Sequence, residues 1–140
     1  MEKTEKKAIV EKAVSMLAND EWDKFQNLYT IDENSLIEHL VDYLFWADNC
    51  ITANDVISYI RGMLEAHDIR DIFADTLKEH NFIIPTADTK GNEALIIARM
   101  AHGSHLGIKS AINKVAKANN IQIKSYKCGM GHISFCGSRI

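Results

Sequence analysis

The sequence predicts an α+β protein in which helices come first and a small antiparallel sheet follows. Through about residue 80, apolar residues recur at the three- and four-residue spacing of amphipathic helices. From Phe82 onward, short apolar runs are separated by glycine-bearing turns, a pattern typical of strands. We expect an acidic helical region over residues 1–80 and a basic β-α-β-hairpin region over residues 81–140, sharing one core in a single compact domain.

Five helices are expected in the first region. Two of their starts match the capping box, in which a Ser or Thr and an acidic residue three positions later satisfy free backbone amides. These pairs are Ser35 with Glu38 and Thr52 with Asp55. Asp68 is an expected cap for the last helix. The five expected helices cover residues 4–18, about 22–29, 35–47, 52–66 and 68–80.

The second region begins with a short strand before Pro85, the only proline, because its ring disfavours helix at the preceding residue. Residues 94–99 fit either a returning strand or the start of a helix, and periodicity does not separate the two. A clear amphipathic helix runs from Ile108 and closes at Asn119 and Asn120. Two alternating segments around Gly129 and Gly131 then predict a C-terminal β-hairpin.

Charge divides sharply along the chain. Residues 94–140 contain no Asp or Glu but seven Lys and Arg, whereas the first 93 residues hold all 19 acidic and 9 of the 16 basic residues. The net charge of −3 therefore conceals a segment of −10 followed by one of +7. This asymmetry favours a polyanion site or a surface for an acidic partner.

Other features restrict the class of protein. No apolar run approaches the ~20 residues of a membrane span. The charged N-terminus lacks the apolar stretch of a signal peptide, so we expect a cytoplasmic protein. Cys50, Cys128 and Cys136 form an odd set, which favours reduced thiols over a disulfide framework.

Two overlapping stretches resemble helix-turn-helix proteins. The order helix, helix, strand, loop, strand over Ile51–Ala98 is similar to a winged helix. In that fold the second helix enters the major groove, but here it carries Asp68, Asp71 and Asp75, which phosphates would repel. The stretch Ile97–Val115 resembles the helix-turn-helix of the lactose-repressor class. It differs from that class at His102, Gly103 and Gly107.

The leading functional hypothesis is a small nucleic-acid-associated protein, such as a regulator. It would bind DNA or RNA backbone through its C-terminal helix and hairpin. In this hypothesis lysines contact phosphates, Asn113 reads a base edge, and Tyr126 stacks on an unpaired base. The alternative is that these lysines form only a solvated helix face. The candidate residues are Arg99, Lys109, Asn113, Lys114, Lys117, Lys124, Tyr126 and Lys127.

A second hypothesis belongs to another class: a protein-binding inhibitor or adaptor, of the kind that phages direct against host machinery, acting through its charge-segregated surfaces. An exposed apolar patch beside the basic surface would favour this hypothesis.

Three minor alternatives concern small ligands and catalysis. The glycine-bearing loop His102–Gly107 leads into a helix and resembles the acetyl-coenzyme A loop of small acetyltransferases, which would imply an anion or coenzyme site. Cys128, His132 and Cys136, with His102 or His105, have residue types that suit zinc. The same histidines near Ser104 or Cys128 would suit acid–base catalysis. We expect no catalytic residue, metal or cofactor as the leading outcome.

Overall fold

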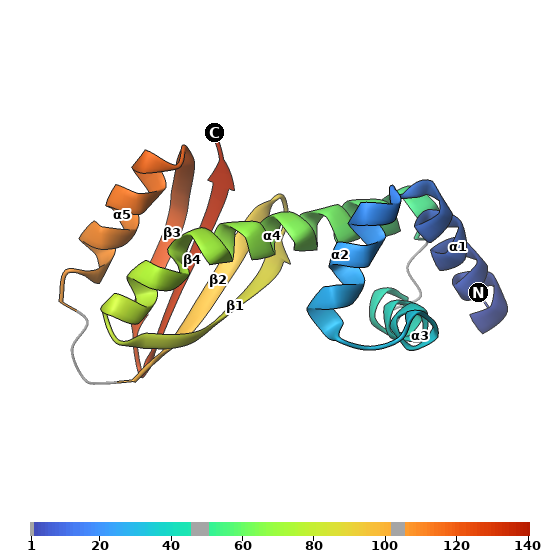
Figure 1. Ribbon diagram of the computed structural model, residues 1–140, viewed down its shortest axis with the longest axis horizontal. Coiled ribbons are helices and arrows are strands. Elements are labelled where there is room, and N and C mark those ends of the chain that lie inside the picture. The colour runs from blue at the N-terminus through green and yellow to red at the C-terminus, as the bar shows by residue number, and fades with distance from the viewer. Residues whose placement is uncertain (1, 46–50, 102–105) are drawn as a thin grey trace. The chain divides into compact units, whose positions relative to one another are not determined.

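The computed structural model describes residues 2–45, 51–101 and 106–140 (Figure 1). The chain forms two compact units, residues 1–64 and 65–140, and each has its own cluster of buried apolar side chains. The expected order of helices, sheet, one further helix and C-terminal hairpin is confirmed. The elements are α1 (Lys3–Met16), α2 (Asn19–Tyr29), α3 (Glu33–Leu44), α4 (Ala53–Glu79), β1 (Phe82–Lys90), β2 (Glu93–Met100), α5 (Ile108–Ala118), β3 (Ile121–Gly129) and β4 (His132–Arg139).

The first unit is built from α1, α2, α3 and the N-terminal part of α4. Its core contains Phe25 from α2, Leu36 and Leu40 from α3 and Ile60 from α4, all fully buried. Aromatic rings extend this core, since Phe25 contacts Tyr29 at a ring-centroid distance of 5.1 Å. The apolar spacing that predicted these helices is therefore the spacing of their buried faces.

α4 is one continuous helix of 27 residues where the sequence predicted two. Its buried side chains continue at helical spacing through the expected break, from Met63 and Ala66 to Ile69 and Phe73. Asp68 is an exposed residue inside this helix and not a cap. No glycine or proline interrupts residues 63–79, so nothing opposes propagation of the helix. Within the described ranges, no helix combines the length and the apolar character that a membrane span requires.

The caps of two helices differ in how well the sequence predicted them. Thr52 and Asp55 form the expected box, in which the Thr52 N–H donates to Asp55 Oδ2 at 2.8 Å and the Asp55 N–H donates to Thr52 Oγ1 at 3.3 Å. At α3 the cap is Asp32, whose Oδ1 accepts from the Ser35 N–H at 2.8 Å. Ser35 thus lies inside the helix, because an Asp three residues earlier supplies the stronger acceptor.

These caps predict a pH dependence of the first unit. Hydrogen bonds from backbone amides lower the pKa values of Asp32 and Asp55. Because the folded pKa lies below the unfolded value of about 4, the stabilisation is present above that pH and is lost as the pH falls through the folded pKa. We expect the free energy of unfolding of the double variant Asp32→Asn and Asp55→Asn, followed by tryptophan fluorescence, to depend less on pH in the acid range than that of the wild-type protein. An unchanged pH dependence in this variant would contradict the assignment.

The second unit is a four-stranded antiparallel sheet with strand order β1-β2-β4-β3. The C-terminal part of α4 and all of α5 lie against one face of this sheet (Figure 1). Residues 94–99, which the sequence left open, belong to strand β2. Ala94, Ile96 and Ala98 face the helices and are buried, and Phe73 of α4 meets Phe135 of β4 edge-on at 5.1 Å.

The division between the units lies between Leu64 and Glu65, whereas the sequence predicted a division at residue 80 and one shared core. The reason is the packing of α4. Its residues Ala66, Ile69, Phe73 and Leu77 belong to the core that contains the sheet. The basic region of the sequence therefore shares its core with the acidic end of α4.

Strand β1 contains an irregularity between Ile83 and Thr86. Ile84, at this point, has a φ of 53° and a side chain that is 64% exposed. A left-handed backbone is unfavourable for a β-branched residue, at roughly 1–2 kcal/mol. We expect Ile84→Gly to raise the free energy of unfolding of the second unit by about 1 kcal/mol, because glycine removes the steric conflict.

This change is measured by urea denaturation beside Ile84→Ala, which removes most of the side chain but keeps the Cβ. Equal stabilities of the two variants would show that the left-handed backbone carries no cost at this position.

Candidate nucleic-acid interface

Helix α5 carries the central part of the candidate interface. It begins at Ile108, after Gly107, whose φ of 80° is readily accessible to glycine. It ends where the sequence predicted, at Asn119, whose Nδ2 donates to the Val115 carbonyl at 2.8 Å. Ile108, Ile112 and Ala116 are buried against the sheet. This anchoring fixes which face of α5 is turned to solvent.

Four of the predicted residues share the exposed face of α5: Lys109, Asn113, Lys114 and Lys117. None of the three lysines forms an ion pair with any residue that the structure describes. Ser110 is exposed on the same face and was missed by the sequence analysis. Helical spacing places it beside Asn113 and Lys114, so the periodicity already contained this signal. The face is thus a row of amine, amide and hydroxyl donors.

Tyr126 of β3 lies next to this face. Its side chain is half-buried, and Lys109 Nζ lies 5.4 Å from the centre of its ring, within the range of a cation–π contact. Burial, and to a smaller extent the neighbouring Cys128 thiol, raises the pKa of Tyr126 to about 12. Lys109, Asn113 and Tyr126 also line a shallow hollow of about 460 Å³ at the start of α5. One ring face of Tyr126 is therefore occupied by Lys109.

The other predicted residues do not join this surface. Arg99 pairs across strands with His132, and Lys127 pairs with Ser134. Their neighbours Ala98 and Tyr126 face the helices, so Arg99 and Lys127 are on the opposite face of the sheet. Lys124 is exposed at the register shift between Ile123 and Ser125. The single basic surface of helix and hairpin predicted from the sequence is thus divided between two faces of the unit.

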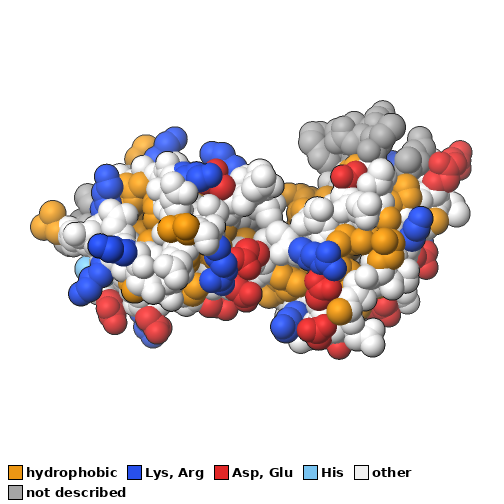
Figure 2. Space-filling view, turned by 90° about the horizontal axis from the view of Figure 1, so that it is seen from above, with side chains coloured by type: hydrophobic (Ala, Val, Ile, Leu, Met, Phe, Trp, Pro, Cys, Tyr) orange, Lys and Arg blue, Asp and Glu red, His pale blue; other side chains and the backbone are white. Residues whose placement is uncertain are grey.

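Acidic side chains limit the extent of the basic field. The second unit has 10 basic and 7 acidic residues, a net charge of +3, and the first unit has 6 basic and 12 acidic residues, a net charge of −6. Exposed carboxylates of α4 include Asp68 and Asp75, and Glu65 forms an ion pair with Arg139 of β4. Figure 2 accordingly shows Asp and Glu side chains beside several of the Lys and Arg side chains over the sheet-containing unit. The basic site is narrow and centred on α5.

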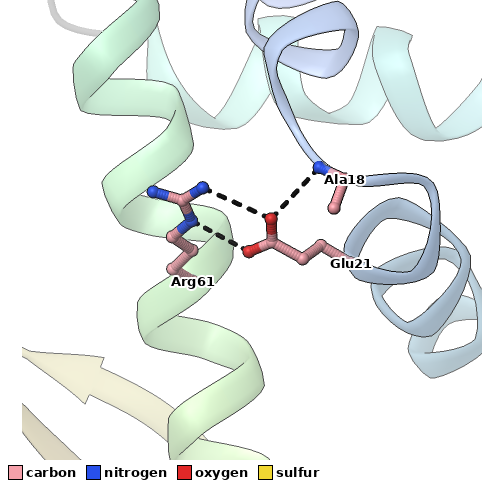
Figure 3. A network of polar contacts seen from close by, with 3 residues as sticks. All are labelled: Ala18, Glu21 and Arg61. Carbon is pink, nitrogen blue, oxygen red and sulfur yellow. Dashed lines mark hydrogen bonds and ion pairs between the residues drawn. The ribbon is translucent and has the colours of Figure 1, made fainter.

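Two basic residues of the first unit, Arg61 and Lys3, are engaged differently from the lysines of α5. Arg61 binds Glu21 through two hydrogen bonds of 2.8 and 3.3 Å, and Glu21 also accepts from the Ala18 N–H at 3.1 Å (Figure 3). The hydrogen bond from Arg61, and to a smaller extent that from the Ala18 N–H, lowers the pKa of Glu21. Lys3 lies 3.1 Å from Glu38. These cations are neutralised within their own unit, unlike the lysines of α5.

Among the residues that the structure describes, the helix pairs that carried the two resemblances are not formed. A helix-turn-helix over Ile97–Val115 requires a first helix where the chain forms strand β2. A winged helix requires two helices where the chain forms the single helix α4. The β-branched residues Ile96 and Ile97 in β2 favour the strand. Any nucleic-acid binding through α5 would therefore use a different arrangement from either family.

The structure also separates the candidate zinc ligands. Cys128 pairs with Ile133 and faces the helices, whereas His132 and Cys136 are on the other face of the sheet. No group of three His, Cys, Asp or Glu among the described residues is arranged to hold a metal ion. His102, Gly103, Ser104 and His105, which the anion-loop, zinc and catalytic alternatives require, lie outside the described residues.

Comparisons with known proteins do not assign the chain to a family. No protein-family model matches it, and neither curated proteins nor solved structures provide a match.

Proposed function

We propose that the protein binds the phosphate backbone of nucleic acid through the exposed face of α5. The observation that carries this proposal is the row formed by Lys109, Asn113, Lys114 and Lys117, whose lysines have no ion-pair partner in the described part of the chain. Lysine ammonium groups contact phosphates as point charges. Asn113, between them, has the amide that pairs with an adenine edge.

The dimensions of α5 fit this role. Lys109 and Lys117 are eight residues apart, so about 12 Å of helix separates them at 1.5 Å per residue. That length spans several successive phosphates of one strand. The carboxylates of α4 repel phosphates outside this stretch, so we expect binding that is weak, local and strongly dependent on salt.

The test is the triple variant Lys109→Ala, Lys114→Ala and Lys117→Ala, assayed with a labelled duplex and a labelled single strand over a salt series. If all three lysines contact phosphates, the plot of log affinity against log salt becomes less steep in the variant, and the magnitude of its slope decreases by about 2–3. The matched control is Lys12→Ala, Lys24→Ala and Lys78→Ala, which removes the same charge from exposed positions elsewhere.

The control variant is expected to retain most of the wild-type slope. Absence of binding by wild-type protein at low salt would end the proposal, and equal losses in both triple variants would reduce it to an effect of net charge.

A second candidate function is docking on a protein partner as an adaptor or inhibitor. The observation that favours it is a group of exposed apolar side chains on and beside the helix-free face of the sheet. Ile83, Ile84 and Ile97 are 39%, 64% and 37% exposed, respectively. Arg99 pairs with Ile83 across β1 and β2, so a basic group lies next to this patch. Exposed apolar side chains grouped in this way are typical of protein-binding surfaces.

A further inference from the structure

The helix-free face of the sheet carries apolar side chains on a central strand. Leu95 and Ile97 of β2 belong to this face, because the residues that alternate with them are buried toward the helices. Leu95 is half-buried and Ile97 is exposed. Strand β2 lies between β1 and β4, inside the sheet. Because antiparallel sheet faces that meet only water are usually polar, these two side chains indicate a partner for the open face.

Charged side chains lie toward opposite ends of the same face. Arg99 and Lys127 lie toward one end, as the pairing of β2, β4 and β3 shows. Toward the other end lie Asp88 and Glu93, with Lys90 paired to Glu93, so two carboxylates and one ammonium group leave a net charge of −1 there. Neither Arg99 nor Glu93 forms an ion pair with any residue that the structure describes. The face therefore has a basic end and an acidic end with apolar side chains between them.

The open face of β2 is complementary to itself. Its side chains are in order acidic, apolar, apolar and basic: Glu93, Leu95, Ile97 and Arg99. A two-fold axis that crosses the strand at Ile96 exchanges the two ends, so Ile97 of one copy lies over Leu95 of the other. By the same operation Arg99 of each copy lies over Glu93 of the other. Packed sheets are about 10 Å apart, a gap that extended Arg and Glu side chains span together.

We propose that the open face of the sheet binds the same face of a second copy of this chain. The proposal rests on the second candidate function, for which it names the partner, and it is independent of the nucleic-acid site on α5. Four strands about 4.8 Å apart and about eight residues long cover about 500 Å², or about 1,000 Å² for both copies. That area is at the lower limit for a specific interface, so we expect a weak dimer that dissociates on dilution.

Sedimentation velocity of the full chain, from micromolar to near-millimolar concentration, measures this association. We expect Arg99→Glu and Glu93→Arg each to weaken it at least about tenfold, because symmetry makes each reversal place like charges together at two points. The double variant Arg99→Glu and Glu93→Arg is expected to recover most of the wild-type affinity, since acid and base have only changed places. The control variants Asp75→Arg and Lys78→Glu, at exposed positions of α4, are expected to associate as the wild-type protein does.

Ile97→Lys tests the apolar centre of the contact and is expected to leave the protein monomeric over the same range. Its control is Met16→Lys, which changes an exposed apolar residue of the first unit. Backbone amide spectra verify that each variant is folded. A wild-type protein that stays monomeric, a dimer that Ile97→Lys leaves intact, or a folded double variant without recovery would overturn the proposal.

Nucleic-acid binding by the Ile97→Lys variant separates this proposal from the one for α5. At concentrations where the wild-type protein is monomeric, we expect the variant to show the wild-type dependence of affinity on salt. Loss of the dimer with unchanged nucleic-acid binding supports two separate surfaces. Loss of nucleic-acid binding in the folded Ile97→Lys variant would contradict that separation, because it would assign the open face to nucleic acid.

Discussion

Replacing Phe73 with Ala is expected to lower the free energy of unfolding of the second unit by about 4 kcal/mol. Phe73 is fully buried between α4 and the sheet, and its ring meets Phe135 edge-on at a centroid distance of 5.1 Å. The substitution removes the buried ring and leaves a cavity that neighbouring helices and strands fill only in part. The loss of the edge-on contact with Phe135 lowers the free energy of unfolding further.

Urea denaturation followed by backbone amide signals of β2 and β4 measures this effect. The control is Ile83→Ala, which removes a side chain that is 39% exposed and is expected to cost less than 1 kcal/mol. A Phe73→Ala variant within 1 kcal/mol of wild type would contradict the packing of α4 on the sheet.

Phe25→Ala is expected to have an effect of similar size, about 4 kcal/mol, on the first unit. Phe25 is fully buried, and its ring contacts those of Trp22, Tyr29 and Tyr59 at centroid distances of 5.9, 5.1 and 6.5 Å. Its removal therefore disrupts a chain of aromatic contacts as well as a single packing site. The urea midpoint measured by tryptophan fluorescence is expected to fall.

Tryptophan fluorescence is specific for the first unit, because Trp22 and Trp46 both precede residue 65. The two Phe variants together thus test the division of the chain into units. We expect Phe25→Ala to shift the fluorescence midpoint more than the amide signals of the strands, and Phe73→Ala to do the reverse. Equal shifts of both probes in both variants would indicate one cooperative unit.

The sequence predicted those parts of the fold that depend on local patterns. The helical spacing of Ile108 and Ile112 located α5, and Thr52 with Asp55 located the start of α4. The break at Asp68 was wrong because a cap residue is only a local preference, and the buried face of α4 continues past it. The division between two cores depends on tertiary packing, which local periodicity does not contain.

The candidate site was predictable to a similar extent. One helix period sufficed to place Lys109, Lys114 and Lys117 on a single exposed face. The positions of Arg99 and Lys127 required the strand pairing and the register shift after Ile123, because a shift of one residue exchanges the two faces of a strand.

The division at Leu64 and Glu65 lies inside a helix, which affects how the two units are separated experimentally. Most domain boundaries fall in exposed linkers, where proteases cut readily. Here the backbone hydrogen bonds of α4 extend across the boundary, so limited proteolysis is not expected to release two intact fragments. Splitting the gene at this point would create a new, uncapped helix end in each fragment. The N-terminal fragment would still keep the natural cap at Thr52, at the other end of its helix.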